Sequence, residues 1–324
     1  MSLFDECFST YSTLTEKPKK WKSFWENELN ALKEIPFEIK RGEEGELKNI
    51  NAKYININFQ SYNKYNIYSK LIIPKKVDLK NSKSSVIVLF PDYFKNINFY
   101  EDLLKEEFAY FIIRLRGHEN YIDLRKPVSD SDQSVIKSYG FFSENLLHIK
   151  NYYMKNLYLD AYRALEVIRL QKEIDTSKIA IWGTGIGAAM AVFVSSFMKR
   201  TSALFLENPS FSHLAVTQNI SKSDYAREIN KYLKVNNSAR ISIKSNLSIL
   251  DAMYFADDLD IPVCMGIDLR NKETAPHGGF ALFHRLPSEK DMHIITENLS
   301  SDSVKESEPL LIDAAKEFFI KNLK

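Results

Sequence analysis

The sequence predicts a single α/β domain built on a doubly wound, largely parallel β-sheet. Short apolar runs recur at residues 86–90, 109–113, 178–182, 202–206 and 261–267, and segments with helical periodicity separate them. Strands that are buried on both faces of a parallel sheet read as such continuous apolar runs. Repeated alternation of strand and helix with right-handed crossovers gives a doubly wound sheet. The length of 324 residues fits one large domain of this kind.

The N-terminal part of the chain departs from this alternation. Residues 20–33 place aromatic and leucine side chains at helical spacing, so we expect a helix that packs on the domain. Alternating apolar residues from Ile55 to Ile73 then predict an antiparallel hairpin at the edge of the sheet. We expect residues 1–45 to form an N-terminal helical extension of a single domain that spans residues 1–324.

Further helices and two insertions follow from the pattern of the remaining chain. Helical periodicity predicts helices at residues 99–108, 152–171, 224–233, 249–255 and 310–323. In the second of these, we expect the polar face to lie in solvent; its members are Asp160, Arg163, Glu166 and Arg169. We expect residues 119–142 and 210–255 to form insertions or a cap.

Charge and cysteine content exclude several classes of function. Forty-four Lys and Arg residues nearly balance 42 Asp and Glu residues, which leaves a formal net charge of +2 and no field that would attract nucleic acid or an anionic membrane. The two cysteines, Cys7 and Cys264, lack the spacing of a zinc or redox motif, and we expect neither a disulfide nor a metal site. No signal sequence or membrane span is evident, so we expect a cytoplasmic protein without nucleic-acid or membrane partners.

A glycine-rich turn between a strand and a helix is the most informative local feature, and it has two readings. Gly183, Gly185 and Ala188 match the dinucleotide pattern G-x-G-x-x-G/A, with Glu207 as a candidate ribose ligand. The turn, however, lies past the midpoint of the chain, whereas a dinucleotide domain normally begins with it. Alternatively, Gly183, Gly185 and Gly187 occupy the first, third and fifth positions of the nucleophile elbow G-x-S-x-G, with glycine at the nucleophile position.

The surrounding sequence resembles the acetyl xylan esterase / cephalosporin C deacetylase family. Residues 151–164 and 173–179 are similar to the segment that precedes the G-G-S-Q-G-G elbow of that family. Residues 21–29 resemble its F-W-x-x-x-L helix, residues 116–118 stand where it has R-G-Q, and residues 90–93 replace its F-H-G-Y turn. Because these motifs keep their order over nearly the full length, the resemblance implies an α/β-hydrolase fold.

The resemblance implies cleavage of short acyl esters, usually acetyl groups on sugars, by a serine, an aspartate and a histidine. The corresponding positions here are Gly185, Leu269 and Ser300, none of which supplies that chemistry, and Asp268 lies one residue before the aspartate position. The family forms its oxyanion hole from backbone N–H groups that correspond to Tyr93 and Ile186. The three family catalytic groups are therefore all replaced.

The pocket of the family also includes the arginine of its R-G-Q motif, which corresponds to Arg116 and is followed here by Gly117 and His118. The acid that the family pairs with this arginine becomes Ser301, so we expect Arg116 either to have lost its partner or to pair with Asp302. A rebuilt triad would have to use Thr184, Asp268 and a histidine. For the candidate histidines, which are His118, His277 and His284, a structural role is the stronger expectation.

These observations favour a catalytically inactive protein that retains the esterase scaffold as a ligand-binding or assembly subunit. Glycine adopts the strained backbone angles of an elbow at no steric cost, so the loss of the nucleophile is expected to stabilise the turn. We expect no cofactor, a small acylated sugar or another small molecule as ligand, and, since active relatives form rings, a homo-oligomer. Two alternatives remain open, an active esterase with relocated groups and a dinucleotide-binding protein.

Overall fold

The computed structural model describes residues 2–10, 15–77, 82–95, 104–118, 140–271, 273–287, 289–295 and 304–324. Within these ranges nine strands form one sheet in the order β1-β2-β3-β5-β4-β6-β7-β8-β9. The strands are β1 (Lys40–Leu47), β2 (Ala52–Gln60), β3 (Asn66–Pro74), β4 (Ser84–Phe90), β5 (Ala109–Ile113), β6 (Ile174–Thr184), β7 (Ala203–Glu207), β8 (Val263–Asp268) and β9 (Lys290–Ile295). Strands β4 to β9 pair in parallel, whereas β1, β2 and β3 pair in antiparallel fashion with each other and β3 also with β5, so the predicted α/β class is confirmed.

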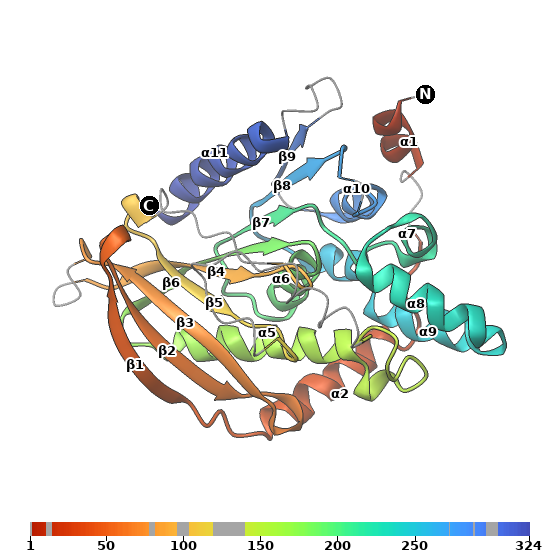
Figure 1. The fold of residues 1–324 in the computed structure, drawn as a ribbon, viewed down its shortest axis with the longest axis horizontal. Coiled ribbons are helices and arrows are strands. Elements are labelled where there is room, and N and C mark those ends of the chain that lie inside the picture. The colour runs from red at the N-terminus through yellow and green to blue at the C-terminus, as the bar shows by residue number, and fades with distance from the viewer. Residues whose placement is uncertain are drawn as a thin grey trace.

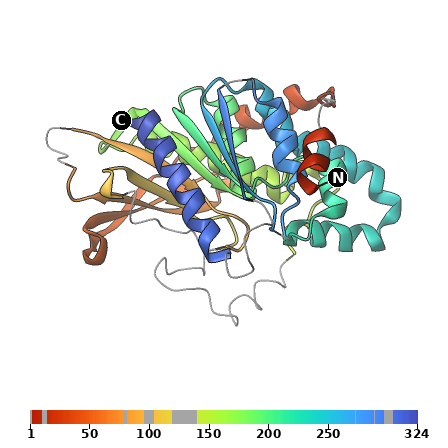
Figure 2. The same cartoon turned by 90° about the horizontal axis from the view of Figure 1, so that it is seen from above.

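Helices cover both faces of the sheet (Figure 1). The α-helices are α1 (Leu3–Thr10), α2 (Trp21–Lys33), α5 (Tyr153–Arg169), α6 (Ile186–Phe197), α7 (Leu214–Ile220), α8 (Asp224–Val235), α9 (Arg240–Leu250), α10 (His277–Arg285) and α11 (Val304–Leu323). Helix α11 lies along one face of the sheet, where Figure 2 shows it in dark blue. Helices α2, α5, α6 and α10 pack on the other.

Alternating residues along the central strands contribute their side chains to two hydrophobic cores, one on each face of the sheet. In β4, Val86 and Val88 face the larger core under α5 and α6, whereas Ile87 and Leu89 face α11. This burial on both faces explains the continuous apolar runs in the sequence, since neither side of a central parallel strand contacts water.

The antiparallel edge of the sheet contains one strand more than predicted. The expected hairpin corresponds to β2 and β3, and β1 pairs with β2 outside it, so residues 1–45 are not wholly helical. Strand β1, with the sequence KRGEEGEL, is mostly exposed and highly charged and thus lacks the apolar alternation that identifies a strand. The helix expected at 249–255 is a 3-10 helix, η5 (Ala252–Asp258), that follows α9. The first half of the helix expected at 99–108 falls outside the described residues, and only residues 104 and 105 of the second half are helical.

The predicted solvent face of α5 is wrong. Asp160 is 2% exposed and Arg163 is 1% exposed. Arg163 donates from Nη2 to the carbonyl oxygens of Leu32 and Ile35 at the end of α2. The periodic pattern identified a polar stripe correctly, but its first two members are buried. Arg163 contacts the end of α2 and pairs with Glu166, whereas Asp160 binds Arg116, which is distant in the sequence.

The segment 210–255, predicted to be an insertion or cap, contains α7, α8 and α9, which extend beyond the end of the sheet in Figure 1. The other predicted insertion, 119–142, falls mostly outside the described residues. Among the helices that the structure describes, none has the length and apolarity needed to cross a lipid bilayer.

Candidate functional site

The carboxyl ends of β4, β6, β7 and β8 bring most of the predicted site residues to one edge of the sheet. In the parallel register, Phe90 of β4 lies opposite Gly183 of β6, and Thr184 lies opposite Glu207 of β7. The turn after β4 therefore lies next to the turn after β6. Ligands of doubly wound sheets bind outside the carboxyl ends of the strands, so this edge is the candidate site.

Gly185 forms the apex of the turn between β6 and α6. Its backbone angles are φ 56° and ψ −116°, a region that costs most residues with a side chain of order 1–3 kcal/mol. The N–H of Gly185 donates to the carbonyl oxygen of Glu207 at 2.9 Å, and its own carbonyl oxygen accepts from the N–H of Ser210 at 3.1 Å. The turn thus has the shape of a nucleophile elbow that is anchored to β7.

The Asp92 carboxylate occupies the space that a side chain at Gly185 would need. A Cβ built on Gly185 would lie 2.2 Å from both Cγ and Oδ1 of Asp92. Oδ1 accepts hydrogen bonds from the backbone N–H of Tyr93 at 2.8 Å and of Ile186 at 2.9 Å. These two N–H groups are the ones that the family resemblance assigns to the oxyanion hole. A carboxylate of the chain itself therefore occupies both donors.

Sequence reasoning missed this role of Asp92. The signal was present, since the carboxylate replaces the glycine of the family's F-H-G-Y turn while glycine replaces the serine of its elbow. Compared with the family motifs, the larger side chain therefore lies at position 92, and position 185 has none. Recognising the exchange requires knowing that the two turns touch, which follows from the parallel pairing of β4 with β6.

The electrostatics of Asp92 reflect a largely desolvated carboxylate with neutral donors. Burial raises its pKa from 3.8 to about 6, against the lowering effect of the Ile186 and Tyr93 N–H groups and of Lys95. The N–H of Ile186 also belongs to the N-terminus of α6, where the helix dipole favours a negative charge. Asp92 is therefore mostly ionised at neutral pH and places a negative charge in the hole.

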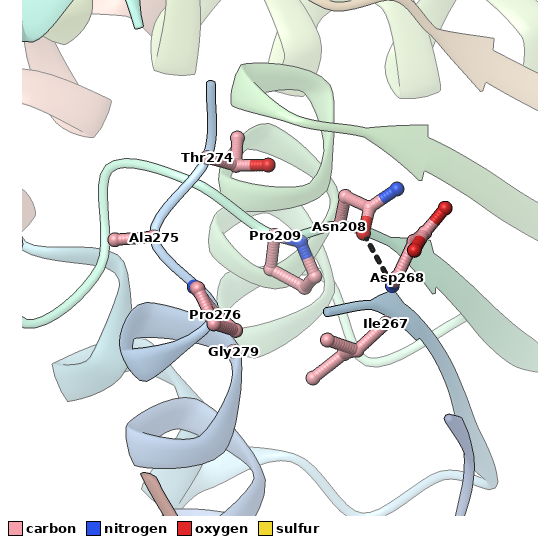
Figure 3. A pocket seen from close by; sticks show the side chains of 8 residues that line it. All are labelled: Asn208, Pro209, Ile267, Asp268, Thr274, Ala275, Pro276 and Gly279. Atoms are coloured by element: carbon pink, nitrogen blue, oxygen red, sulfur yellow. Dashed lines mark hydrogen bonds between the residues drawn. The ribbon is translucent and has the colours of Figure 1, made fainter. Parts of the chain in front are cut away.

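At the end of β8 the Asp268 carboxylate is bound by an arginine. The Asp268 carboxylate accepts from Nε and Nη2 of Arg270, each at 2.9 Å, and its backbone N–H donates to Oδ1 of Asn208 at 2.8 Å (Figure 3). Leu269, at the family's aspartate position, is buried. The hollow beside Asp268 is shallow, and the described residues that line it include no histidine. The third family position, Ser300, lies outside the described residues, as does Asp302.

The described hydrogen bonds of Thr184 and Asp268, the candidate groups of a relocated triad, are to residues other than the candidate histidines. Thr184 Oγ1 donates to Oε2 of Glu207 at 3.4 Å, and the hydrogen bonds of the Asp268 carboxylate are all to Arg270. His277 Nε2 lies 3.5 Å from Oε1 of Glu6 on α1. His284 packs edge-on against the ring of Phe8, with 5.3 Å between ring centres. Among the residues that the structure describes, neither Thr184 nor Asp268 has a hydrogen bond to a histidine.

The R-G-H segment lies beside the elbow and has a structural partner. Arg116 binds the Asp160 carboxylate through Nε at 2.7 Å and Nη2 at 2.6 Å. The expectation that Arg116 had lost its partner is therefore wrong, and the other expected partner, Asp302, is among the residues that the structure does not describe. The backbone N–H of Gly117 donates to the hydroxyl of Tyr65. His118 stacks on Phe94 at 4.2 Å, and burial lowers its pKa to about 3, so its imidazole is neutral.

Two geometric facts bear on cofactors. Glu207, the candidate ribose ligand, accepts from Trp182 Nε1 at 3.2 Å and from Thr184 at 3.4 Å, and the N–H of Ile186 at the helix N-terminus already binds Asp92. Within the described part of the chain, no group of three or more His, Cys, Asp or Glu side chains is arranged to hold a metal ion.

Comparisons with known proteins agree with this architecture. Residues 1–312 match the family model "Acetyl xylan esterase (AXE1)". An acetyl xylan esterase from Paenibacillus sp. R4 superposes with a TM-score of 0.79 at 20% identity over 97% of this chain and 99% of that chain. Acetyl Xylan Esterase 1 from Thermoanaerobacterium sp. JW/SL YS485 gives 0.76 at 18% identity over 96% and 98%.

A more distant match is an acylaminoacyl peptidase from Pyrococcus horikoshii, with a TM-score of 0.59 at 17% identity over 91% of this chain and 43% of that chain. These structural neighbours share the α/β-hydrolase fold with the present chain. The match to the family model spans almost the whole sequence. The chain therefore belongs to the acetyl xylan esterase family.

Proposed function

We propose that this member of the acetyl xylan esterase family does not hydrolyse esters and instead acts as a binding protein for a small ligand. The observation that supports the proposal most strongly is the Asp92 carboxylate, which fills the side-chain space at Gly185 and accepts from both candidate oxyanion donors. The proposed binding role rests on the retained fold of the family, in which only the catalytic groups are replaced.

Ester hydrolysis by this fold requires a nucleophile and stabilisation of a negative oxygen in the transition state. Gly185 offers no nucleophile. The donors that would stabilise the oxyanion face a carboxylate, so a substrate oxygen would have to displace a negative charge. Loss of one oxyanion donor alone reduces kcat by about 10² to 10³. Both losses act on the same step, and together we expect them to make turnover negligible.

The test is hydrolysis of 4-nitrophenyl acetate and acetylated xylo-oligosaccharides by the purified chain, together with labelling by a fluorophosphonate probe. An active acetyl xylan esterase serves as positive control. We expect release of acetate at the rate of buffer and no labelling. Turnover that scales with protein concentration and survives repeated purification would contradict the proposal.

An esterase with relocated groups is the first rival. It predicts that Thr184→Ala abolishes a measurable activity, whereas the present proposal predicts no activity to lose. Dinucleotide binding is the second rival. It predicts a rise in melting temperature with a nicotinamide or flavin cofactor, and we expect none, because the Asp92 charge at the N-terminus of α6 would repel a pyrophosphate.

We further propose that the chain forms a homo-oligomer, as the family resemblance implies. Light scattering coupled to size-exclusion chromatography measures the mass directly, and a mass above that of the 37.6 kDa chain is expected. A monomer across the accessible concentration range would remove this part of the proposal and leave the hydrolytic part untouched.

A further inference from the structure

The Asp92 carboxylate uses only one of its two oxygens for hydrogen bonds. Oδ1 accepts from the backbone N–H groups of both Tyr93 and Ile186. Within the described part of the chain, no group donates to Oδ2. Asp92 is partly exposed, and Oδ2 is not among the described side-chain atoms that are buried without a partner. Oδ2 is therefore both unbonded and accessible to solvent.

We propose that Asp92 is a nucleophile that forms a covalent ester with a small alkyl halide. Oδ2 attacks the saturated carbon, an oxygen–carbon bond forms, and the carbon–halogen bond breaks. The halide leaves with both bonding electrons, so the negative charge passes from the carboxylate to the halide and no proton, oxidant or reductant takes part. Carboxylates serve as covalent nucleophiles in several classes of enzyme. The inference goes beyond the proposed function, because it gives the site a reaction other than ester hydrolysis.

The carboxylate lies where a nucleophilic side chain of this fold would lie. Its Oδ2 is 2.5 Å from the Cβ position at Gly185, the apex of the elbow. An elbow presents the side chain of its apex above the carboxyl ends of the strands. The two N–H groups fix Oδ1, so Oδ2 keeps one orientation before any electrophile arrives. A reacting group that is already oriented avoids much of the entropy cost of reaction.

The surroundings of Asp92 favour an ionised and reactive carboxylate. Burial raises its pKa to about 6, so it is mostly charged at neutral pH and is more basic than a solvated aspartate. Its donors are neutral backbone groups, and partial removal of water leaves the charge less screened by solvent. The nearest charged side chains, Lys95 and Glu273, pair with each other at 2.8 Å, so their charges balance.

The same carboxylate is unsuited to ester hydrolysis. Attack on an acetyl ester would give a mixed anhydride and expel an alkoxide, which is far more basic than the carboxylate, so the reverse reaction would dominate. Attack on a saturated carbon gives a stable alkyl ester and expels a weakly basic halide. Oδ1 becomes the carbonyl oxygen and keeps its two N–H donors. Release of the alkyl group would require a base that activates water, and the described partners of Asp92 are backbone groups. We therefore expect a stable adduct.

The experiment incubates the full chain with 2-bromoethanol and follows the products by intact mass spectrometry, peptide mapping and bromide release. We expect one adduct per chain, located on Asp92, with release of one equivalent of bromide. The rate should rise as the pH passes through about 6 and then level off, because only the ionised carboxylate reacts. Asp92→Asn should lower the rate of adduct formation more than tenfold, since an amide is a poor nucleophile.

Two other carboxylates in the same digest are controls. Burial also raises the pKa of Asp251 to about 6, but Asp251 is 2% exposed and both of its oxygens accept backbone N–H bonds, so it should stay unmodified. The exposed Asp260 reports the background rate of a solvated carboxylate. These comparisons within the wild-type chain hold even if Asp92→Asn does not fold.

Three outcomes would overturn the inference. They are modification of Asp92 no faster than that of Asp260, an equal rate of adduct formation in Asp92→Asn, and an adduct confined to the cysteines. The last is not expected, because Cys7 and Cys264 are buried and burial raises the pKa of each thiol, to about 11 and about 12. The probe carries no ester, so this experiment and the hydrolysis assay can fail independently.

Discussion

The ends of β6 and β8 depart from the family's catalytic motifs in two different ways. At the end of β6 the backbone keeps the elbow shape, and the Asp92 carboxylate has moved into the space of the missing side chain. At the end of β8 a carboxylate is present, but Arg270 binds it and Leu269 fills the neighbouring position. Glycine and the pairing of β6 with β7 maintain the turn, whereas the side chains at the family's catalytic positions are replaced individually.

The largest effect is expected from returning a side chain to the apex. Gly185→Ser would place Cβ against Asp92 and would carry the strain of a positive φ, so we expect the free energy of unfolding to fall by about 3 kcal/mol or more. Urea denaturation measures this loss. Gly140→Ser is the matched control, because Gly140 also has a positive φ of 60° but would meet only the movable Ser143 hydroxyl. It should lose about 1 kcal/mol.

The same pair of positions gives a sharper result as a double-mutant cycle. Asp92→Gly empties the space at the apex, so Gly185→Ser should cost less in that background by about 2 kcal/mol. Independent effects of the two substitutions would show that the side chains do not share this space. That result would mean that Asp92 does not fill the side-chain space at Gly185.

A pH-dependent effect distinguishes Asp92 from a carboxylate held by a cation. Because burial raises its folded-state pKa from 3.8 to about 6, the folded state binds the proton more tightly than the unfolded state, and this group's contribution to stability falls as pH rises through that interval. Relative to the wild type, Asp92→Asn should therefore gain stability with rising pH, by about 2 kcal/mol between the two limits.

Chemical denaturation at a series of pH values measures this difference. Asp251, whose pKa burial also raises to about 6, is retained in both proteins, so its contribution cancels. A difference that stays constant with pH would mean that Asp92 keeps the same pKa in the folded and unfolded states. The β6 end would then resemble an ordinary solvated turn.

The smallest effect is expected at the end of β8. Asp268→Ala removes a partly buried ion pair, in which the Arg270 and Asp268 side chains are 13% and 15% exposed, and should lower the free energy of unfolding by about 1 kcal/mol. No change in hydrolysis should accompany it. A loss of esterase activity in this variant would show that Asp268 has a catalytic role. The distinction drawn between the ends of β6 and β8 would then be wrong.

The sequence allowed the prediction of elements whose burial is uniform. The apolar run 109–113 coincides with β5, and the three glycines at 183, 185 and 187 identified the elbow turn. Strand β1 escaped prediction because its side chains are mostly exposed and charged, so neither periodicity nor hydrophobicity marks it. The central strands of the sheet can thus be predicted from local composition, whereas the exposed edge strand β1 cannot.

The site was predictable only where a single residue decides its chemistry. The loss of the nucleophile follows from Gly185 alone. The positions of Asp92 and of the Asp160 partner of Arg116 depend on contacts between segments far apart in the chain, 94 residues in the first case and 44 in the second. Helical periodicity placed Asp160 on a polar face but carried no information about what covers that face.

The most direct test follows the amide protons of Tyr93 and Ile186 by NMR through a pH titration of the deuterated protein. Both donate to the same carboxylate oxygen, so both should shift with one common apparent pKa near 6, and the shift should vanish in Asp92→Asn. If the two amides titrate at different pH values, or if neither responds, the carboxylate does not occupy the oxyanion donors and the account of a blocked site is wrong.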